Sequence, residues 1–152
     1  MLPYAELLLT TYADMRVSLA GADRNFVFTI YNPEWEEGNV VIACEDGALT
    51  LSFATMHEPF DGDFGELVAL VDELIRDESM IFELYSHGKD VLGGSRGTDE
   101  IDIDHSIPAF LRSLCEGDRA LYAEIKEIMQ RGQCYCKLRG WRKERNRSVI
   151  LS

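Results

Sequence analysis

Hydrophobic side chains recur at two different spacings in the first third of the chain. Between residues 3 and 19 they return every three or four positions, which predicts an amphipathic helix that begins at Pro3 and stops near Gly21. From residue 26 the spacing changes to two, which predicts strands over 26–31, 40–45 and 48–55. Asp46-Gly47 separates the last two strands and is typical of a type I′ hairpin.

A second helical pattern follows residue 63. Asp63 can cap this helix, and Glu66 can complete a capping box three residues later. Its apolar stripe is formed by Phe64, Leu67, Val68, Val71, Leu74 and Ile75.

Shorter segments complete the predicted order of elements. We expect strands over 80–86 and 91–95, a helical region over 108–131 that is interrupted near 116–118, and late strands within 133–141 and 148–152. Helices that alternate with hairpins favour an α+β fold, in which helices pack on one face of a mostly antiparallel sheet. The sequence therefore predicts one two-layer domain over residues 1–152.

The charge is distributed unevenly. The net charge is −12, yet residues 131–152 are basic, so the remainder forms an acidic body over 1–130. Such a body repels nucleic acid and anionic membranes and attracts basic proteins. The basic segment has two interpretations: it neutralises the acidic face of its own domain, or it binds nucleic acid.

Two further features concern the compartment. The longest apolar runs are shorter than a membrane span, and the start MLPYAELLL lacks the basic region of a signal peptide. Cysteines 44, 115, 134 and 136 do not form a disulfide pattern. We expect a reduced, cytoplasmic protein without a membrane partner.

His57 is the main candidate for chemistry. If the alternation of Leu49, Leu51 and Phe53 continues, His57 lies on the same apolar face, at the rim of the sheet. Asp61 and Asp63 follow closely, so a small metal-dependent or His/carboxylate hydrolase is one hypothesis. The alternative is that His57 orders the turn before the helix, and no nucleophile stands at a recognisable spacing.

Other motifs argue against a bound metal or cofactor. The segment DEIDIDH over 99–105 has alternating carboxylates, but it lacks the glycine and the final glutamate of a calcium loop. The segment GGSRG over 93–97 lacks the spacing of a phosphate-binding loop. We expect no cofactor, no metal site and no catalytic residue.

Acidic loops are the candidate contacts for a partner. Trp35 lies among carboxylates on a long loop, where it can anchor a basic partner or fold back over the core. The candidate partner-binding residues are Trp35, Glu36, Glu37, Asp61, Asp63, Asp99, Glu100, Asp102 and Asp104.

One longer pattern is similar to a known family. GALTLSF, then HEPFDGD, an acidic amphipathic helix and MIFELYSHGKDVLGGS together resemble small bacterial immunity proteins of polymorphic toxin systems, over roughly residues 40–97. The resemblance implies a binding protein and not an enzyme.

Three functional hypotheses follow. The leading one is a non-enzymatic protein that binds a basic partner, such as a nuclease-like toxin, through charge and shape. The second is the hydrolase that uses His57, Asp61 and Asp63. The third is a self-associating structural module, for which a homodimer is expected.

Overall fold

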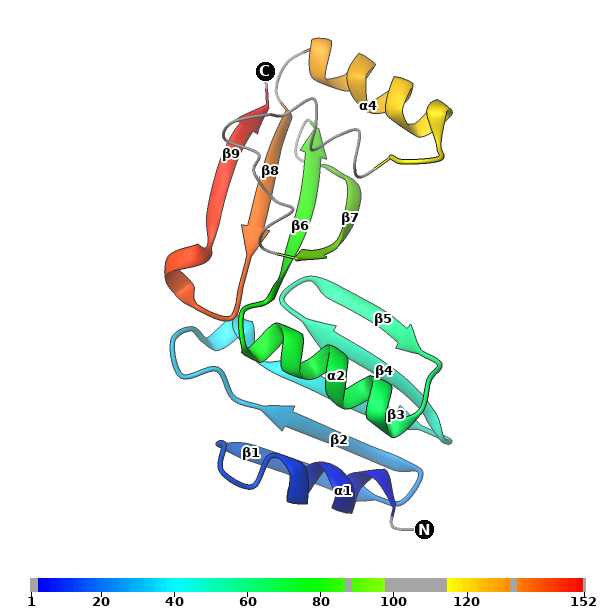
Figure 1. Cartoon of the computed structure of the whole chain (residues 1–152), viewed down its shortest axis with the longest axis vertical. Coiled ribbons are helices and arrows are strands. Elements are labelled where there is room, and N and C mark those ends of the chain that lie inside the picture. Colours follow the sequence, from blue (N-terminus) through cyan, green and yellow to red (C-terminus); the bar gives the residue numbers. More distant parts are fainter. Residues whose placement is uncertain (1–2, 87–88, 98–114, 132–133, 152) are drawn as a thin grey trace. The chain divides into compact units, whose positions relative to one another are not determined.

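The computed structural model describes residues 3–86, 89–97, 115–131 and 134–151. The chain divides into two compact units (Figure 1). The first comprises Met1–Arg76 with Trp141–Lys143, and the second comprises Asp77–Gly140 with Glu144–Ser152. The sequence predicts that residues 1–152 form one domain, which means that the two units unfold together. This stays a prediction.

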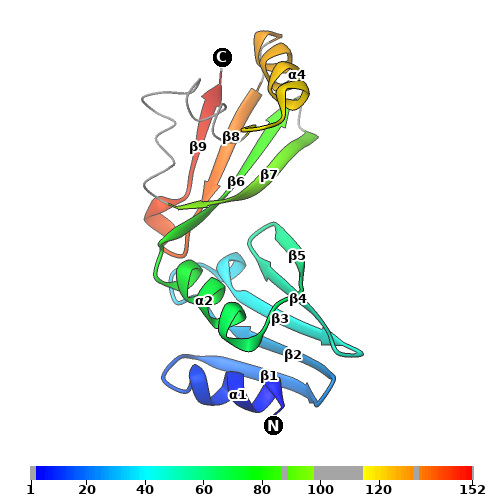
Figure 2. The ribbon, with the colours of Figure 1, turned by 45° about the vertical axis from the view of Figure 1, so that its right-hand side comes forward.

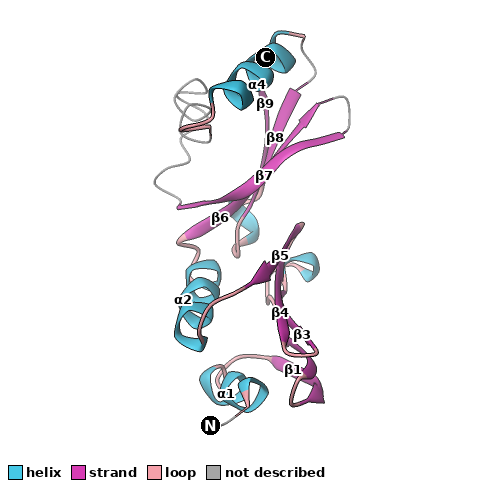
Figure 3. Cartoon of the chain, turned by 90° about the vertical axis from the view of Figure 1, so that its right-hand side faces the viewer, coloured by secondary structure: helices cyan, strands magenta, loops and turns pink. Residues whose placement is uncertain are grey.

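The first unit contains a five-stranded antiparallel sheet in the order β1-β2-β3-β4-β5. Its elements along the chain are α1 (Tyr4–Thr11), β1 (Val17–Ala22), β2 (Asn25–Ile30), the 3-10 helix η1 (Glu36–Gly38), β3 (Val40–Glu45), β4 (Ala48–Phe53), β5 (Met56–Phe60) and α2 (Phe64–Ile75). Both α-helices lie on one face of this sheet (Figure 3).

Alternation along the strands builds the first core. Phe26, Phe28 and Ile30 are buried, as the period of two predicts, and inward side chains of β3 and β4 continue the layer. Tyr12 links the two helices to it: its ring packs against Phe28, and its hydroxyl donates a hydrogen bond to the carboxylate of Asp72 on α2 at 3.1 Å.

The second unit contains a four-stranded antiparallel sheet in the order β7-β6-β8-β9 (Figure 2). Its elements are β6 (Ser79–Ser86), β7 (Lys89–Gly97), α4 (Arg119–Gln130), β8 (Cys134–Arg139) and β9 (Arg147–Leu151); the 3-10 helix η3 (Lys143–Arg145) precedes β9. A separate core joins inward side chains of β6 and β8 to Ile125 of α4.

The α+β class and the antiparallel pairing are confirmed, as are several local predictions. Asp63 caps α2 within a complete capping box with Glu66. Asp46 and Gly47 both have positive φ, 51° and 86°, as a type I′ turn requires. The prediction of a single sheet is wrong, because β6 belongs to a second sheet. In the described part of the chain β6 pairs only with β7 and β8.

The predicted helix over 3–19 is also wrong in its second half. The helix ends at Thr11, and residues 17–22 form β1 instead. Leu19 fits a helical stripe, but it equally fits the inward positions of a strand, where it pairs with Phe28. Ladder pairing with β2 over six residues outweighs the weak helical preference of a segment that contains β-branched Val17.

Candidate protein-binding site

Carboxylates gather at one end of the five-stranded sheet. Because its strands are antiparallel, the β1–β2 turn, the β3–β4 turn and the β5–α2 connection all lie at this end. We call it the carboxylate end. Its five acidic residues are all exposed, and they are Asp23, Glu45, Asp46, Asp61 and Asp63.

Hydrogen bonds fasten the two turns of the carboxylate end to each other. The Arg24 guanidinium donates to the carbonyl of Asp46 at 2.7 Å, and the amide of Gly47 donates to the carbonyl of Arg24 at 3.0 Å. The amide of Asp46 donates to Oδ1 of Asn25 at 3.1 Å, and the Cys44 thiol donates to the Arg24 carbonyl at 3.2 Å. These bonds hold the positions of Asp23 and Asp46 before any partner arrives.

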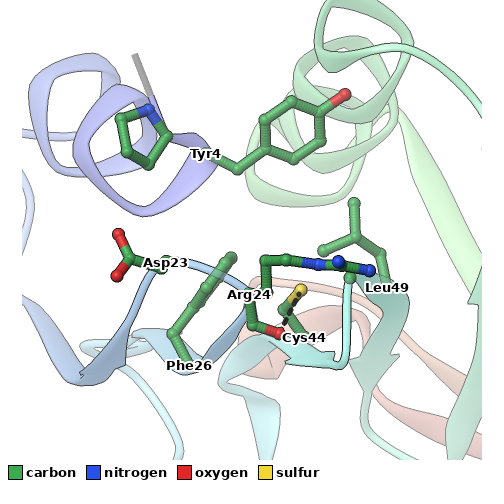
Figure 4. Close-up of a pocket in the computed structure, with 8 residues that line it drawn as sticks. Tyr4, Asp23, Arg24, Phe26, Cys44 and Leu49 are labelled. Carbon is green, nitrogen blue, oxygen red and sulfur yellow. Dashed lines mark hydrogen bonds between the residues drawn. The ribbon is translucent and has the colours of Figure 1, made fainter. Parts of the chain in front are cut away.

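A pocket opens between the start of α1 and the inner face of the sheet at the carboxylate end (Figure 4). Its volume is ≈ 340 Å³. Carbon atoms form most of the lining, and Arg24 extends across it toward Leu49. The lining residues are Pro3, Tyr4, Asp23, Arg24, Phe26, Cys44, Gly47 and Leu49.

The β5–α2 connection adjoins this pocket. Phe60 is the register partner of the pocket residue Leu49, and the ring of Phe64 lies 5.3 Å from that of Tyr4. Asp61 and Asp63, which the sequence predicts as partner contacts, therefore stand beside the pocket. Asp63 also accepts the amide of Glu66 at 2.8 Å, so it both caps α2 and contributes charge at the surface.

The opposite end of the sheet carries the other described candidates. Glu36 and Glu37 are exposed on η1, about 20 Å from the carboxylate end given six-residue strands. The Trp35 indole instead turns inward: it donates to the carbonyl of Trp141 at 3.0 Å and meets the Phe53 ring edge-on. A Cβ on Gly38 would approach the Trp35 ring to 2.3 Å, so only glycine permits this packing.

The interpretation of Trp35 as folded back over the core is thus the one the structure favours. Asn32 strengthens the same loop, because its amide donates to the carbonyls of Gly38 and Trp141 at 3.1 and 2.8 Å. The backbone amide of Lys143 donates to the Glu34 carboxylate at 3.1 Å. Two basic residues of the C-terminal segment, Arg142 and Lys143, therefore belong to the acidic unit, which favours the neutralising interpretation of that segment.

His57 does not lie where the alternation predicts. The chain reverses at Ala54 and Thr55, so His57 pairs with Ser52 on the outward face, opposite Leu51 and Phe53. Its Nδ1 hydrogen-bonds the Ser52 hydroxyl at 2.8 Å, and the ring is exposed. Strand β5 was not predicted because the turn before it contains Ala54, at φ 52°, and alanine is not a residue type that marks a tight turn.

His57 lies on β5, whereas Asp61 and Asp63 lie in the β5–α2 connection, where Asp63 caps α2. Within the described ranges, no three histidine, cysteine or carboxylate side chains are placed to hold a metal ion. The remaining candidates Asp99, Glu100, Asp102 and Asp104, like His87, lie outside the described residues.

The second unit carries a different polar cluster on the face of its sheet that lacks α4. The rings of Tyr85 and Tyr135 stack with centroids 5.2 Å apart, and the Lys137 ammonium lies 5.0 Å from the Tyr85 centroid. The Tyr85 hydroxyl donates to the buried carboxylate of Glu83. The contacts of Tyr85 with Tyr135 and Lys137 tie β6 to β8, and the hydrogen bond from Tyr85 gives the buried Glu83 carboxylate a partner within β6.

Of the two turns beside the pocket, Asp46-Gly47 is the one that the sequence predicts. Asp23-Arg24 follows the predicted helix end near Gly21 and was not predicted as a turn, and the convergence of the two turns depends on the order of the strands. No protein-family model, no curated protein and no solved structure matches this chain. Among the described helices, none has the length and apolar character needed to cross a membrane.

Proposed function

We propose that this chain is a non-enzymatic binding protein whose first unit engages a basic protein partner at the carboxylate end. One observation carries the proposal: five exposed carboxylates lie at the same end of the sheet as a pocket with a largely apolar lining. Long-range charge attracts a basic partner and speeds its approach, while a rigid surface between the charges provides the contact.

The composition of the first unit supports this choice. Residues 1–76 and 141–143 contain fourteen Asp and Glu against five Arg and Lys. Asp61 and Asp63 supply charge at the carboxylate end, whereas the aromatic ring of Trp35 is engaged within the unit. A narrower form of the proposal is an immunity protein that neutralises a basic, nuclease-like toxin by covering its cationic active site.

The test compares two double variants that change the net charge equally. Asp46→Asn with Asp61→Asn removes two negative charges from the carboxylate end, and Glu36→Gln with Glu37→Gln removes two from the opposite end. Asn suits the positive φ of position 46, and no side-chain bond is broken at residue 61 in the described structure. Wild type and both variants are immobilised, exposed to lysate of the source cell and washed at low and high salt.

We expect basic proteins on the wild type that high salt removes. The first double variant should lose most of them, and the second should retain them. If both variants lose the same share of the basic proteins that the wild type binds, only the total charge matters. Retention that concentrated salt leaves unchanged would contradict a charge-driven partner.

A further inference from the structure

The pocket at the carboxylate end has a mostly apolar lining, whereas the surface around it is acidic. We infer that it is the anchor site for one bulky apolar side chain of the partner, presented by a lysine- or arginine-rich segment. This inference rests on the proposed function and names the kind of segment that would be recognised.

The size and lining of the pocket select an apolar group. Its volume of ≈ 340 Å³ lies at the lower end of the range for ligand sites, about 300–1,000 Å³, which suits a single aromatic or large aliphatic side chain. Phe26, Cys44 and Leu49 form the floor on the inner face of the sheet, and Tyr4 forms a wall from α1 (Figure 4). Bound side chains in such pockets dominate the energetics of protein interfaces.

The charges around the pocket select what flanks that group. Arg24 is the one cation among the described residues that line the pocket, and its guanidinium already donates to the Asp46 carbonyl. Asp23 lines the pocket, and the other four acidic residues of the carboxylate end are exposed at the same end of the sheet, so carboxylates outnumber the Arg24 guanidinium there. The local field is therefore negative, which favours cationic flanks and disfavours a carboxylate ligand.

The pocket is preorganised for this role. Four hydrogen bonds join the β1–β2 turn to the β3–β4 turn beside the pocket. They include the bond from the Arg24 guanidinium to Asp46 and the bond from the Gly47 amide to Arg24. The Tyr4 ring is held against Phe64. Few side chains of the pocket need to become ordered when a partner binds, which lowers the entropic cost of binding.

The experiment uses the full chain and three capped pentapeptides as probes: Lys-Lys-Phe-Lys-Lys, Lys-Lys-Ala-Lys-Lys and Glu-Glu-Phe-Glu-Glu. Titration calorimetry measures each affinity at low salt and at physiological salt. We expect the lysine peptide with Phe to bind about tenfold or more tightly than its Ala analogue, because the ring is removed from water. The glutamate peptide should not bind.

Variants of tyrosine locate the binding. Tyr4→Ala removes the wall of the pocket and should abolish the advantage of Phe over Ala, whereas Tyr4→Phe should preserve it. Tyr31→Ala is the matched control, since Tyr31 lies at the opposite end of the sheet, where Arg16 covers its ring. Circular dichroism checks that each variant is folded, and if Tyr4→Ala unfolds, the comparison of the Phe and Ala peptides on the wild type still decides whether an apolar anchor contributes to binding.

Several outcomes would overturn the inference. Equal, salt-sensitive binding of both lysine peptides would mean that charge alone acts, which removes the pocket from the proposal but leaves the proposed function standing. Tighter binding of the glutamate peptide would show that Arg24 dominates. If no peptide binds, the anchor site is rejected, and the lysate comparison alone then decides the proposed function.

Discussion

The two units of this chain are built from similar antiparallel sheets but differ in charge and in core chemistry. The first unit has fourteen acidic against five basic residues, while the second has thirteen against ten. The net charge of −12 therefore describes neither unit well. A charge-driven partner is expected to distinguish them, and the first unit is where the field is strongest.

Their cores differ as well. Aromatic and aliphatic side chains fill the first, whereas Cys115, Cys134 and Cys136 all belong to the core of the second. Burial raises the pKa of the Cys115 and Cys134 thiols, so both stay protonated near neutral pH and are poor nucleophiles. All four cysteines of the chain are free and buried.

A practical consequence of the division is spectroscopic. Both tryptophans, Trp35 and Trp141, belong to the first unit. Tryptophan fluorescence therefore follows the unfolding of the first unit, while far-ultraviolet circular dichroism follows both units. The two signals together can separate one cooperative domain from two.

The largest expected effect comes from Leu138→Ala in the core of the second unit. Leu138 is fully buried, so the cavity should cost about 2–5 kcal/mol of the free energy of unfolding. Residues 141–143 belong to the first unit but are flanked in sequence by β8 and β9 of the second. When the second unit unfolds, these residues should leave the first unit and destabilise it as well. We expect urea unfolding by fluorescence and by circular dichroism to shift together.

Leu74→Ala is the matched control in the first unit, because Leu74 is equally buried. It should shift the fluorescence transition by a similar amount. A Leu138→Ala protein whose fluorescence transition stays at the wild-type urea concentration would show two independent domains and would refute the prediction of one.

An intermediate effect is expected from Asn32→Ala in the loop that holds Trp35. The Asn32 side chain donates to two carbonyls and accepts the amide of Glu34 at 2.9 Å. Leaving these buried partners unpaired should cost about 2–3 kcal/mol. Chemical denaturation measures the loss, and the Trp35 emission should shift to longer wavelength as the loop loosens.

Asn146→Ala is the comparison in the second unit. Asn146 accepts one hydrogen bond, from the amide of Gly140 at 2.8 Å, so its loss should cost only about 1 kcal/mol. Equal costs at the two positions would mean that the network around Asn32 contributes nothing beyond a single bond.

The smallest effect is a pH dependence centred on Tyr12. Burial, and then the charge and hydrogen bond of Asp72, raise the pKa of Tyr12 well above its usual value. The folded state therefore holds this proton more tightly than the unfolded state, whose tyrosines ionise near pH ~10. The stabilisation is complete below that pH and is lost as the pH rises toward the folded pKa.

Tyr12→Phe tests this by comparison with the wild type between pH 8 and pH 11. At pH 8 the variant should be less stable by about 1 kcal/mol because the bond to Asp72 is missing. Above pH ~10 the wild type should lose up to about 1.4 kcal/mol per pH unit from this group, so the two curves converge. Parallel curves would exclude Tyr12 as the source.

Local sequence determined the elements whose signals involve neighbouring residues. The capping box of Asp63 and Glu66 and the positive-φ pair Asp46-Gly47 act over two or three positions. The alternation of Phe26, Phe28 and Ile30 likewise needs only a strand with one buried face. Prediction succeeded there because each pattern has one favourable local structure.

Tertiary structure decided the rest, since those features depend on partners distant in sequence. Leu19 suits a helix or a strand, and pairing with Phe28 selects the strand. The turn at Ala54 has positive φ without a turn residue, and it is held by the pairing of β4 with β5. The carboxylate end exists only because antiparallel order brings Asp23, Asp46 and Asp61 to the same end of one sheet.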